Sequence, residues 1–211
     1  MVADLVSLED ASLLIGISVE RVRQLVVRGD LPGVRFGNAW AVPRASVMAR
    51  RHQGGHRGRP LSAGRAWAEI LGGPIRLDNV GRYRNRAASS RYGMSPADAE
   101  YLVEAGVALR SGVAAAVSWG ELLAADVSHV SHIDLYVSEA SHRRMAELVA
   151  MVADPLGPVV VRVLSDEIWP DVVAASDESR SAPALAVALD LMDSGDPRHW
   201  IAGEHLASAH G

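Results

Sequence analysis

The sequence predicts an α/β protein in three parts: a small N-terminal module of helices and a hairpin, a basic linker, and a larger C-terminal α/β half. The N-terminal part has two amphipathic helix patterns followed by two strand patterns around a turn. The segment RRHQGGHRGRP at 50–60 is basic, rich in glycine and free of apolar residues. After residue 107, strand and helix patterns alternate, which is typical of an α/β domain. The length of 211 residues suits one large domain or two small ones.

Capping residues and apolar spacing define the N-terminal helix pair. Ser7 can cap a first helix, which Gly16 ends by adopting a left-handed conformation. The apolar face of this helix comprises Leu8, Ala11, Leu14 and Ile15. Ser18 can cap a second helix that stops at Gly29. The buried side of the second helix is expected to contain Val19, Val22, Leu25 and Val26.

A hairpin and a third helix follow the helix pair. Leu31-Pro32 leads into a strand over 34–36, a Gly37-Asn38 turn and a second strand over 39–42. Pro43 suits the first turn of a helix from about Arg44 to His52. We expect Trp40, and similarly Phe36, to pack the hairpin onto the helices.

The run SLEDASLLIGISVERVRQLVVRGDLPGVRFGNAWAVPRASVMARR resembles the winged helix-turn-helix of excisionases and MerR-like regulators. The helix pair, the Gly-Asp-Leu-Pro link and the short hairpin carry this resemblance, which covers about residues 4–51. It implies a DNA-binding domain over 1–51, whose second helix enters the major groove. The alternative is a helical hairpin used only for protein contacts.

The polar side chains of the second helix are residue types that read DNA. Arginine donates two hydrogen bonds to guanine and glutamine pairs with adenine, so Arg21 and Gln24 are the base-reading candidates, with Arg23 beside them. Ser18 can bind a phosphate. The full set of DNA-binding candidates is Ser18, Glu20, Arg21, Arg23, Gln24, Arg28, Arg35, Asn38, Arg44, Arg50 and Arg51. Each is equally compatible with solvated surface charge.

Residues 52–60 are predicted to be a flexible basic linker, because they lack apolar groups to bury. Its cationic arm comprises Arg50, Arg51, Arg57 and Arg59, which can follow the DNA backbone and add salt-dependent affinity. His52 and His56 have a metal-like spacing. Two glycines argue against a helix there and no third ligand is near, so no metal is expected.

Charge is divided unevenly along the chain. Up to Tyr92 there are fifteen arginines and seven acidic residues. From Gly93 onward there are six arginines and eighteen acidic residues. A basic half joined to an acidic half indicates a polyanion-binding module attached to a part that avoids polyanions. The absence of cysteine excludes disulfide scaffolds and thiol catalysis. No stretch approaches the ~20 apolar residues of a bilayer span and the N-terminus lacks a basic leader, so we expect a cytoplasmic, nucleoid-associated protein without membrane contact.

Residues 61–106 are predicted to be a helical connector. Ser62 can cap the helix GRAWAEIL, a second helix covers about Val80 to Ala88, and Ser95-Pro96 opens a third through Glu104. The basic residues of this segment include Arg82, Arg84, Arg86 and Arg91. They would extend the DNA-binding surface or contact a partner, and a solvated connector face is an equally good interpretation.

Residues 107–211 are predicted to be an acidic α/β domain that serves as an antitoxin, oligomerisation or effector part. The expected strands cover 107–109, 133–137 and 159–164. The expected helices cover 112–125, 139–153 and 184–192, with a last one from Asp196-Pro197 to about 207. The helix over 139–153 would place Met145, Leu148, Val149 and Val152 on one face.

Two polar groups in this half are candidate sites on residue type alone. Asp190, Asp193 and Asp196 form a carboxylate series, although Asp196 is also a suitable helix cap. His129 and His132 precede a strand that contains Asp134, which suits a ligand set or a base; a loop of ordinary histidines is the simpler interpretation. Nucleophile-elbow, phosphate-loop and dinucleotide motifs do not occur. We therefore expect no catalysis, cofactor or metal.

The segments VVVRVLSDEIWP and APALAVALDLMDSGDPRHWIAGEHL, in their strand and helix order, are similar to the C-terminal domain of AbiEi-like antitoxins. This similarity covers roughly residues 107–207. It implies a repressor encoded beside a nucleotidyltransferase toxin. Members of that family carry a different winged-helix module at the front, so the excisionase-like module is a departure.

Together these observations predict a sequence-specific transcriptional repressor that acts as the autoregulating antitoxin of a toxin-antitoxin system. Its expected partners are double-stranded DNA of its own promoter and a nucleotidyltransferase toxin. A homodimer is expected because one small helix-turn-helix makes few base contacts. The alternative is an excisionase-like or MerR-like regulator without a toxin partner. An enzyme fused to a DNA-targeting module is a third class.

Overall fold

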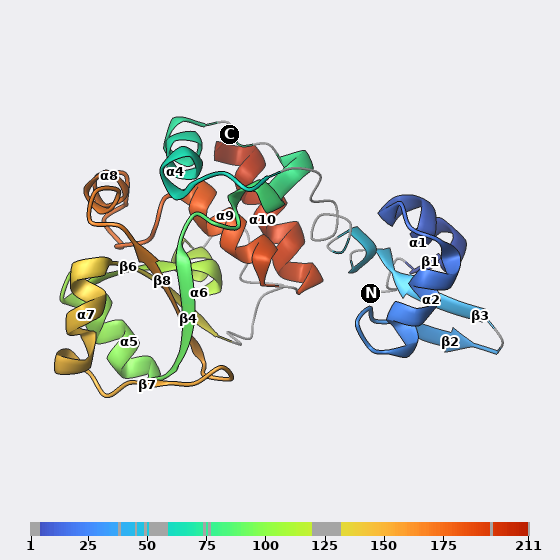
Figure 1. Cartoon of the computed structure of the whole chain (residues 1–211), viewed down its shortest axis with the longest axis horizontal. Coiled ribbons are helices and arrows are strands. Elements are labelled where there is room, and N and C mark those ends of the chain that lie inside the picture. The colour runs from blue at the N-terminus through green and yellow to red at the C-terminus, as the bar shows by residue number, and fades with distance from the viewer. Residues whose placement is uncertain are drawn as a thin grey trace.

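The computed structural model describes residues 5–37, 39–44, 46–48, 50, 59–73, 75, 77–119, 132–194 and 196–210. It is a mixed α/β protein, which confirms the predicted class (Figure 1). Among these residues, buried apolar side chains form one cluster drawn from residues 6–47 and two drawn from residues 61–207. The N-terminal part therefore has an apolar core of its own.

The helix pair forms at the predicted positions, as α1 (Leu8–Ile15) and α2 (Val19–Val27). Ser7 Oγ accepts a hydrogen bond from the Asp10 N–H at 3.0 Å, and Ser18 Oγ accepts one from the Arg21 N–H at 3.3 Å. Gly16 ends α1 with a φ of 77°, the left-handed region that favours glycine. Both predicted caps and this stop are confirmed.

The N-terminal strands form an antiparallel sheet in the order β1-β3-β2, comprising β1 (Leu5–Ser7), β2 (Val34–Phe36) and β3 (Ala39–Pro43). The hairpin agrees with the sequence pattern, whereas β1 has only three residues and gives no readable pattern. Pro43 is the last residue of β3, and the helix expected from about Arg44 begins directly after it, with residues 44, 46–48 and 50 helical.

The two aromatic residues of the hairpin differ in burial. Trp40 packs against the N-terminal core, as predicted. Phe36 is 59% exposed, so its predicted packing is wrong. The register explains the difference: Trp40 pairs with Arg35, and Phe36 pairs with Ala39, so the two rings lie on opposite faces of the sheet.

The C-terminal half contains a five-stranded sheet in the order β5-β6-β8-β4-β7. Its strands are β4 (Ala88–Gly93), β5 (Ala108–Ser111), β6 (Ile133–Ser138), β7 (Val152–Ala153) and β8 (Val159–Leu164). Strands β6 and β8 are parallel, and the other pairs are antiparallel. Because paired residues point to the same face, Asp134, Tyr136 and Arg162 share one face of this sheet.

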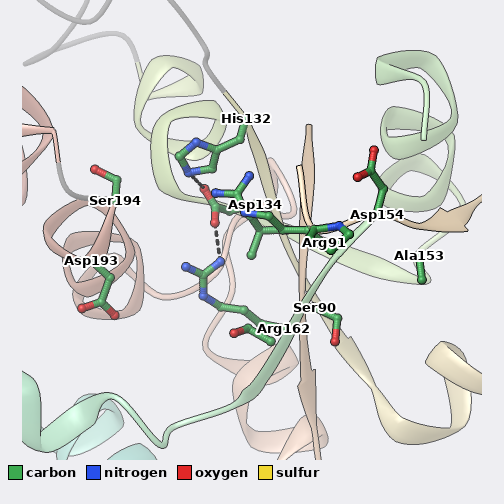
Figure 2. Close-up of a pocket in the computed structure, with 12 residues that line it drawn as sticks. Ser90, Arg91, His132, Asp134, Ala153, Asp154, Arg162, Asp193 and Ser194 are labelled. Atoms are coloured by element: carbon green, nitrogen blue, oxygen red, sulfur yellow. Dashed lines mark hydrogen bonds and ion pairs between the residues drawn. The ribbon is translucent and has the colours of Figure 1, made fainter. Parts of the chain in front are cut away.

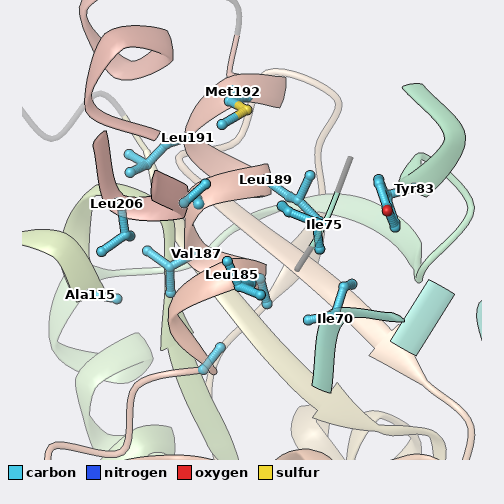
Figure 3. Packing of buried hydrophobic residues seen from close by; sticks show 14 of the residues in the cluster. Ile70, Ile75, Tyr83, Ala115, Leu185, Val187, Leu189, Leu191, Met192 and Leu206 are labelled. Carbon is cyan, nitrogen blue, oxygen red and sulfur yellow. The ribbon is translucent and has the colours of Figure 1, made fainter. Parts of the chain in front are cut away.

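Helices cover both faces of the sheet (Figure 1). Helices α5 (Pro96–Glu104) and α7 (Glu139–Leu148) pack on one face, where Leu102 and Met145 meet Val161. On the opposite face lie α4 (Ala63–Gly72), α6 (Gly112–Ser118) and α9 (Ala184–Asp193), and α10 (Pro197–His210) packs against α9. Helix α9 is central, with Leu185, Val187, Leu189 and Leu191 all buried (Figure 3).

Several predicted elements change in the structure. The helix predicted over 80–88 is wrong: residues 77–83 form a short 3-10 helix and Ala88 begins β4, which pairs with β8. The helix predicted over 139–153 ends at Leu148, and Val152 lies in β7 with 71% exposure. Its buried face is limited to Met145 and Val149. Helix α8 (Trp169–Ala174) has no counterpart among the predicted elements.

Other boundaries agree with the sequence. Ser62 and Ser95 cap α4 and α5 as expected. Asp196 accepts a hydrogen bond from the Arg198 N–H at 2.8 Å at the start of α10, which supports its role as a cap. The second part of the helix predicted over 112–125 lies outside the described residues. Within the described part, no helix is long and apolar enough to cross a membrane.

Candidate functional sites

The first candidate site is the polar side of α2. Val22, Leu25 and Val26 are buried in the N-terminal core, which confirms the predicted inward face. The predicted outward residues Glu20, Arg21, Arg23, Gln24 and Arg28 are all exposed. Helix α2 together with its C-terminal cap residue therefore presents three arginines, a glutamine and a glutamate to solvent.

The two base-reading candidates contact each other. Arg21 Nη1 donates a hydrogen bond to Gln24 Oε1 at 3.2 Å, so both side chains lie over the same turn of α2. Arg23 lies 3.9 Å from Glu20, with more than half of each side chain exposed, so this ion pair adds little stability. Ser18 is exposed at the helix N-terminus, where backbone N–H groups and the helix dipole favour an anion.

The hairpin and the following helix contribute further arginines. The Arg35 guanidinium lies 6.0 Å from the centre of the Trp40 ring, and Arg35 Nε donates to the Gly37 carbonyl at 3.0 Å. Arg44 is exposed. Arg50 Nη1 donates to the Asp30 carbonyl at 3.3 Å, so its side chain reaches back to the loop after α2. The candidates Asn38 and Arg51 lie outside the described residues, as do His52, His56 and Arg57.

The second candidate site is a network of charged side chains on the α9 side of the C-terminal sheet. Asp190 on α9 is buried and accepts hydrogen bonds from Arg86, Ser111 and Tyr136, the last at 3.1 Å. Arg162 Nε lies 2.8 Å from the same carboxylate. Arg86 also contacts Asp193 at 2.7 Å. Such a network is expensive to bury and stable only when its members are paired.

The network extends along β8 and β6 to Asp134. Arg162 Nη1 donates to Asp134 Oδ1, and His132 Nε2 lies 3.1 Å from Asp134 Oδ2 (Figure 2). Gly112 makes room for this carboxylate: it has a φ of 56°, and a Cβ there would overlap Asp134 Oδ2. A glycine is therefore required at this position on both counts.

Electrostatics keeps the network charged. Burial opposes ionisation of Asp134, but Arg162 and His132 together lower the pKa of this carboxyl below its usual value. Burial, followed by the negative charge of Asp190, raises the pKa of Tyr136, so its hydroxyl stays protonated. Burial also opposes the charge of Arg86, while Tyr136 and the neighbouring aspartates raise its pKa well above the ordinary value.

A cavity of about 710 Å³ opens at the end of this network (Figure 2). We call it the polar cavity. It is lined by residues 89–91 of β4, His132 and Asp134, Val160 and Arg162, and by residues 153–155 and 193–194. Its volume lies within the range of small-molecule sites. Charged side chains of both signs therefore meet in a space large enough for a ligand.

The structure separates the carboxylates that the sequence places in one series. Asp190 and Asp193 belong to the charged network, whereas Asp196 caps α10. His132 and Asp134 are brought together, and His129 lies outside the described residues. Among the described residues, no group of three or more histidines, cysteines or carboxylates could hold a metal ion.

Sequence reasoning missed the cationic members of the network. Arg86 is buried, so it forms neither a DNA-binding surface nor a solvated connector face. The Arg162 side chain is 11% exposed and lies beside Asp134 and Asp190. A signal for Arg162 existed: it is the single charged residue in the strand VVVRVL, where a cation needs a buried partner.

Comparison of the chain with protein-family models, with curated proteins and with solved structures gave no match. The two sites are therefore interpreted from their own geometry and chemistry.

Proposed function

We propose that this protein is a sequence-specific DNA-binding repressor whose N-terminal part acts as a winged helix-turn-helix. The observation that carries the proposal is the polar side of α2, where Arg21 and Gln24 contact each other beside three further exposed charged residues. A helix of this kind, preceded by a capped turn and followed by a hairpin, suits the major groove.

Each part of the N-terminal module has a role in this proposal. Arg21 and Gln24 contact base edges, with Arg23 as a neighbour. Ser18 at the start of α2 and Arg44 after the hairpin bind phosphates. The hairpin carries Arg35 beside Trp40, a position from which a guanidinium can enter a minor groove. Arg50 adds affinity without sequence preference.

The experiment that tests DNA binding is fluorescence anisotropy of the full chain. The probes are the DNA upstream of its own reading frame and a scrambled duplex of equal length, compared over a salt series. We expect a preference of about 10³ or more for the native site at physiological salt. Equal, salt-sensitive binding to both duplexes would mean that α2 binds polyanions without recognising their sequence, and it would overturn the proposal.

We further propose that this repressor is the antitoxin of a nucleotidyltransferase toxin and autoregulates their shared operon as a homodimer. The support is the similarity of residues 107–207 to AbiEi-like antitoxins, together with the acidic charge of that part. Co-expression with a neighbouring nucleotidyltransferase gene should restore growth that the toxin alone arrests. Continued arrest with a soluble, DNA-binding chain would favour a regulator without a toxin partner.

A further inference from the structure

The polar cavity contains polar groups that make no hydrogen bond to another residue of the described part of the chain. Arg162 is held on two sides, with Nη1 on Asp134 and Nε 2.8 Å from Asp190. These two contacts leave Nη2 without a partner among the described residues. Because the side chain lines the cavity and retains some exposure, the unused N–H groups are accessible from the cavity.

A second set of donors comes from β4. Ser89 pairs in register with Arg162, and Arg91 pairs with Val160, and both residues line the cavity. Arg91 Nη1 donates to the Gly157 carbonyl at 3.1 Å, and among the described residues Nε and Nη2 have no acceptor. Two guanidinium groups therefore offer N–H groups to one space.

The same cavity also contains carboxylate oxygens for which the described residues provide no donor. Asp193 Oδ2 lies 2.7 Å from Arg86, and Asp154 Oδ1 accepts the Leu156 N–H at 2.9 Å. Within the described residues, the second oxygen of each carboxylate makes no hydrogen bond. Both residues line the cavity, so it presents acceptors for a cation as well as donors for an anion.

The charges that line the cavity nearly cancel. Arg91 and Arg162 face Asp134, Asp154 and Asp193, and His132 contacts Asp134. A ligand with a large net charge of either sign would be repelled by the lining groups of the same sign, two arginines or three aspartates. A ligand that carries one charge of each sign satisfies both sets and adds no net charge to the site.

We propose that the polar cavity binds a small zwitterion of the amino acid class. Its carboxylate is held by Arg91 and Arg162, and its ammonium by one of the two carboxylates that line the cavity on either side of them, Asp193 or Asp154. The buried contacts of Arg162 with Asp134 and Asp190 fix the direction of its guanidinium before the ligand arrives, which reduces the entropy cost of binding. This site lies apart from the DNA-reading residues and does not depend on the proposed repressor function.

The test uses the full chain and the twenty common L-amino acids as probes. Thermal unfolding is measured with each amino acid in excess, and any that raises the Tm is titrated by calorimetry. Each such ligand is then compared with its N-acetyl derivative, which lacks the ammonium, and with its methyl ester, which lacks the carboxylate. We expect at least one amino acid to bind, and both derivatives to bind at least about ten-fold more weakly.

Two variants locate the binding. Arg91→Gln removes a cavity guanidinium whose described hydrogen bond is to one carbonyl, and it should weaken binding by about ten-fold or more. Arg144→Gln is the matched control, because Arg144 is exposed on α7 against the opposite face of the sheet. A neutral sugar serves as a further probe that has neither charge. The proposal is overturned if no amino acid binds, or if a derivative or the sugar binds as tightly as the amino acid. It is also overturned if Arg91→Gln and Arg144→Gln have the same affinity for the amino acid. DNA affinity is measured on the same preparations, so failure of one proposal is separable from failure of the other.

Discussion

Arg162 on β8 and Asp190 on α9 form an ion pair across the buried face of the C-terminal sheet, with Nε 2.8 Å from Oδ1. Asp190 also accepts a hydrogen bond from Arg86, so two guanidinium groups from segments far apart in the chain share one carboxylate. The three side chains are almost completely removed from water. Loss of the shared carboxylate should therefore be more damaging than loss of a surface ion pair.

The substitution Asp190→Asn tests this expectation. It preserves the shape of the side chain but leaves two buried guanidinium groups without their common counter-charge, so the free energy of unfolding should fall by about 3–5 kcal/mol. Urea denaturation measures the change. The control is Glu147→Gln, which removes an exposed carboxylate 3.7 Å from Arg144 and should cost less than about 1 kcal/mol. Equal losses in the two variants would contradict the assigned role of Asp190.

Gly112 provides a second test, on backbone conformation and space. Gly112→Ala places a Cβ against Asp134 Oδ2 in a residue with a φ of 56°. The clash and the strain together should destabilise the protein by about 2 kcal/mol or more. Gly64→Ala is the matched control, because Gly64 lies in α4 with open space around it. This substitution should raise the free energy of unfolding by up to about 1 kcal/mol. A neutral Gly112→Ala variant, measured by the same urea titration, would show that the carboxylate moves freely.

His199 should make stability depend on pH. Burial lowers the pKa of this imidazole below its ordinary value of 6.5, although Asp196 acts in the opposite direction. The folded state therefore favours the neutral ring. The contribution of His199 to stability is fully present at a pH above its pKa in the unfolded chain. That contribution is lost as the pH falls through 6.5 toward the lower folded pKa.

The check for His199 is urea denaturation between about pH 5 and 7. His199→Gln should reduce the fall in stability over this window. His210→Gln, at the exposed end of α10, is the control and should leave the fall unchanged. An identical pH dependence in the original chain and in His199→Gln would assign the effect to other groups.

The proposed DNA-reading role of α2 predicts that substitutions in this helix reduce sequence discrimination. Arg21→Ala and Gln24→Ala should each lower the preference for the native site by about 1–3 kcal/mol, because each removes a bidentate base contact. Arg144→Ala, far from α2 in sequence, should leave the preference for the native site unchanged. Anisotropy titrations with native and scrambled duplexes give the ratio of the two affinities, which measures this preference. Full preference in both α2 variants would remove these two residues from the interface.

The cationic arm, if it binds DNA as proposed, predicts a change in the salt dependence of DNA binding. Neutralising Arg50, Arg51, Arg57 and Arg59 should flatten the slope of log affinity against log salt by roughly 1 for each of these arginines that binds a phosphate. Binding to native and scrambled DNA should weaken about equally, because phosphate contacts have no sequence preference. The same anisotropy assay, repeated at several salt concentrations, measures both quantities. An unchanged slope would exclude the arm from contact with DNA.

Local signals are sufficient to predict much of the fold. The Ser7 and Ser18 caps, the turn at Gly16 and the apolar strand of β8 depend on neighbouring residues, and all occur as expected. Strand β4 depends on a distant partner, because Ser89 pairs with Arg162 only after the sheet has assembled. Its polar sequence is typical of a connector, and only tertiary pairing makes it a strand.

The two candidate sites also differ in whether their residues are close together in the sequence. The polar side of α2 follows from helical periodicity within one element, so its exposed residues can be predicted correctly. The charged network joins Arg86, Asp134, Arg162 and Asp190 from four segments, and no spacing along the chain relates them. Pairing of buried charges is a property of the folded state, which is why only the isolated charge in β8 gives a sequence signal.

The position of β4 between β8 and β7 has a consequence for dissecting the molecule. A fragment that begins at residue 107 would lack the strand that covers one side of β8, and would lack Arg86. The valine-rich β8 would then present unpaired backbone groups at the edge of an open sheet, which invites intermolecular strand pairing. Such a fragment should aggregate, whereas one that begins ahead of α4 retains every strand of the sheet.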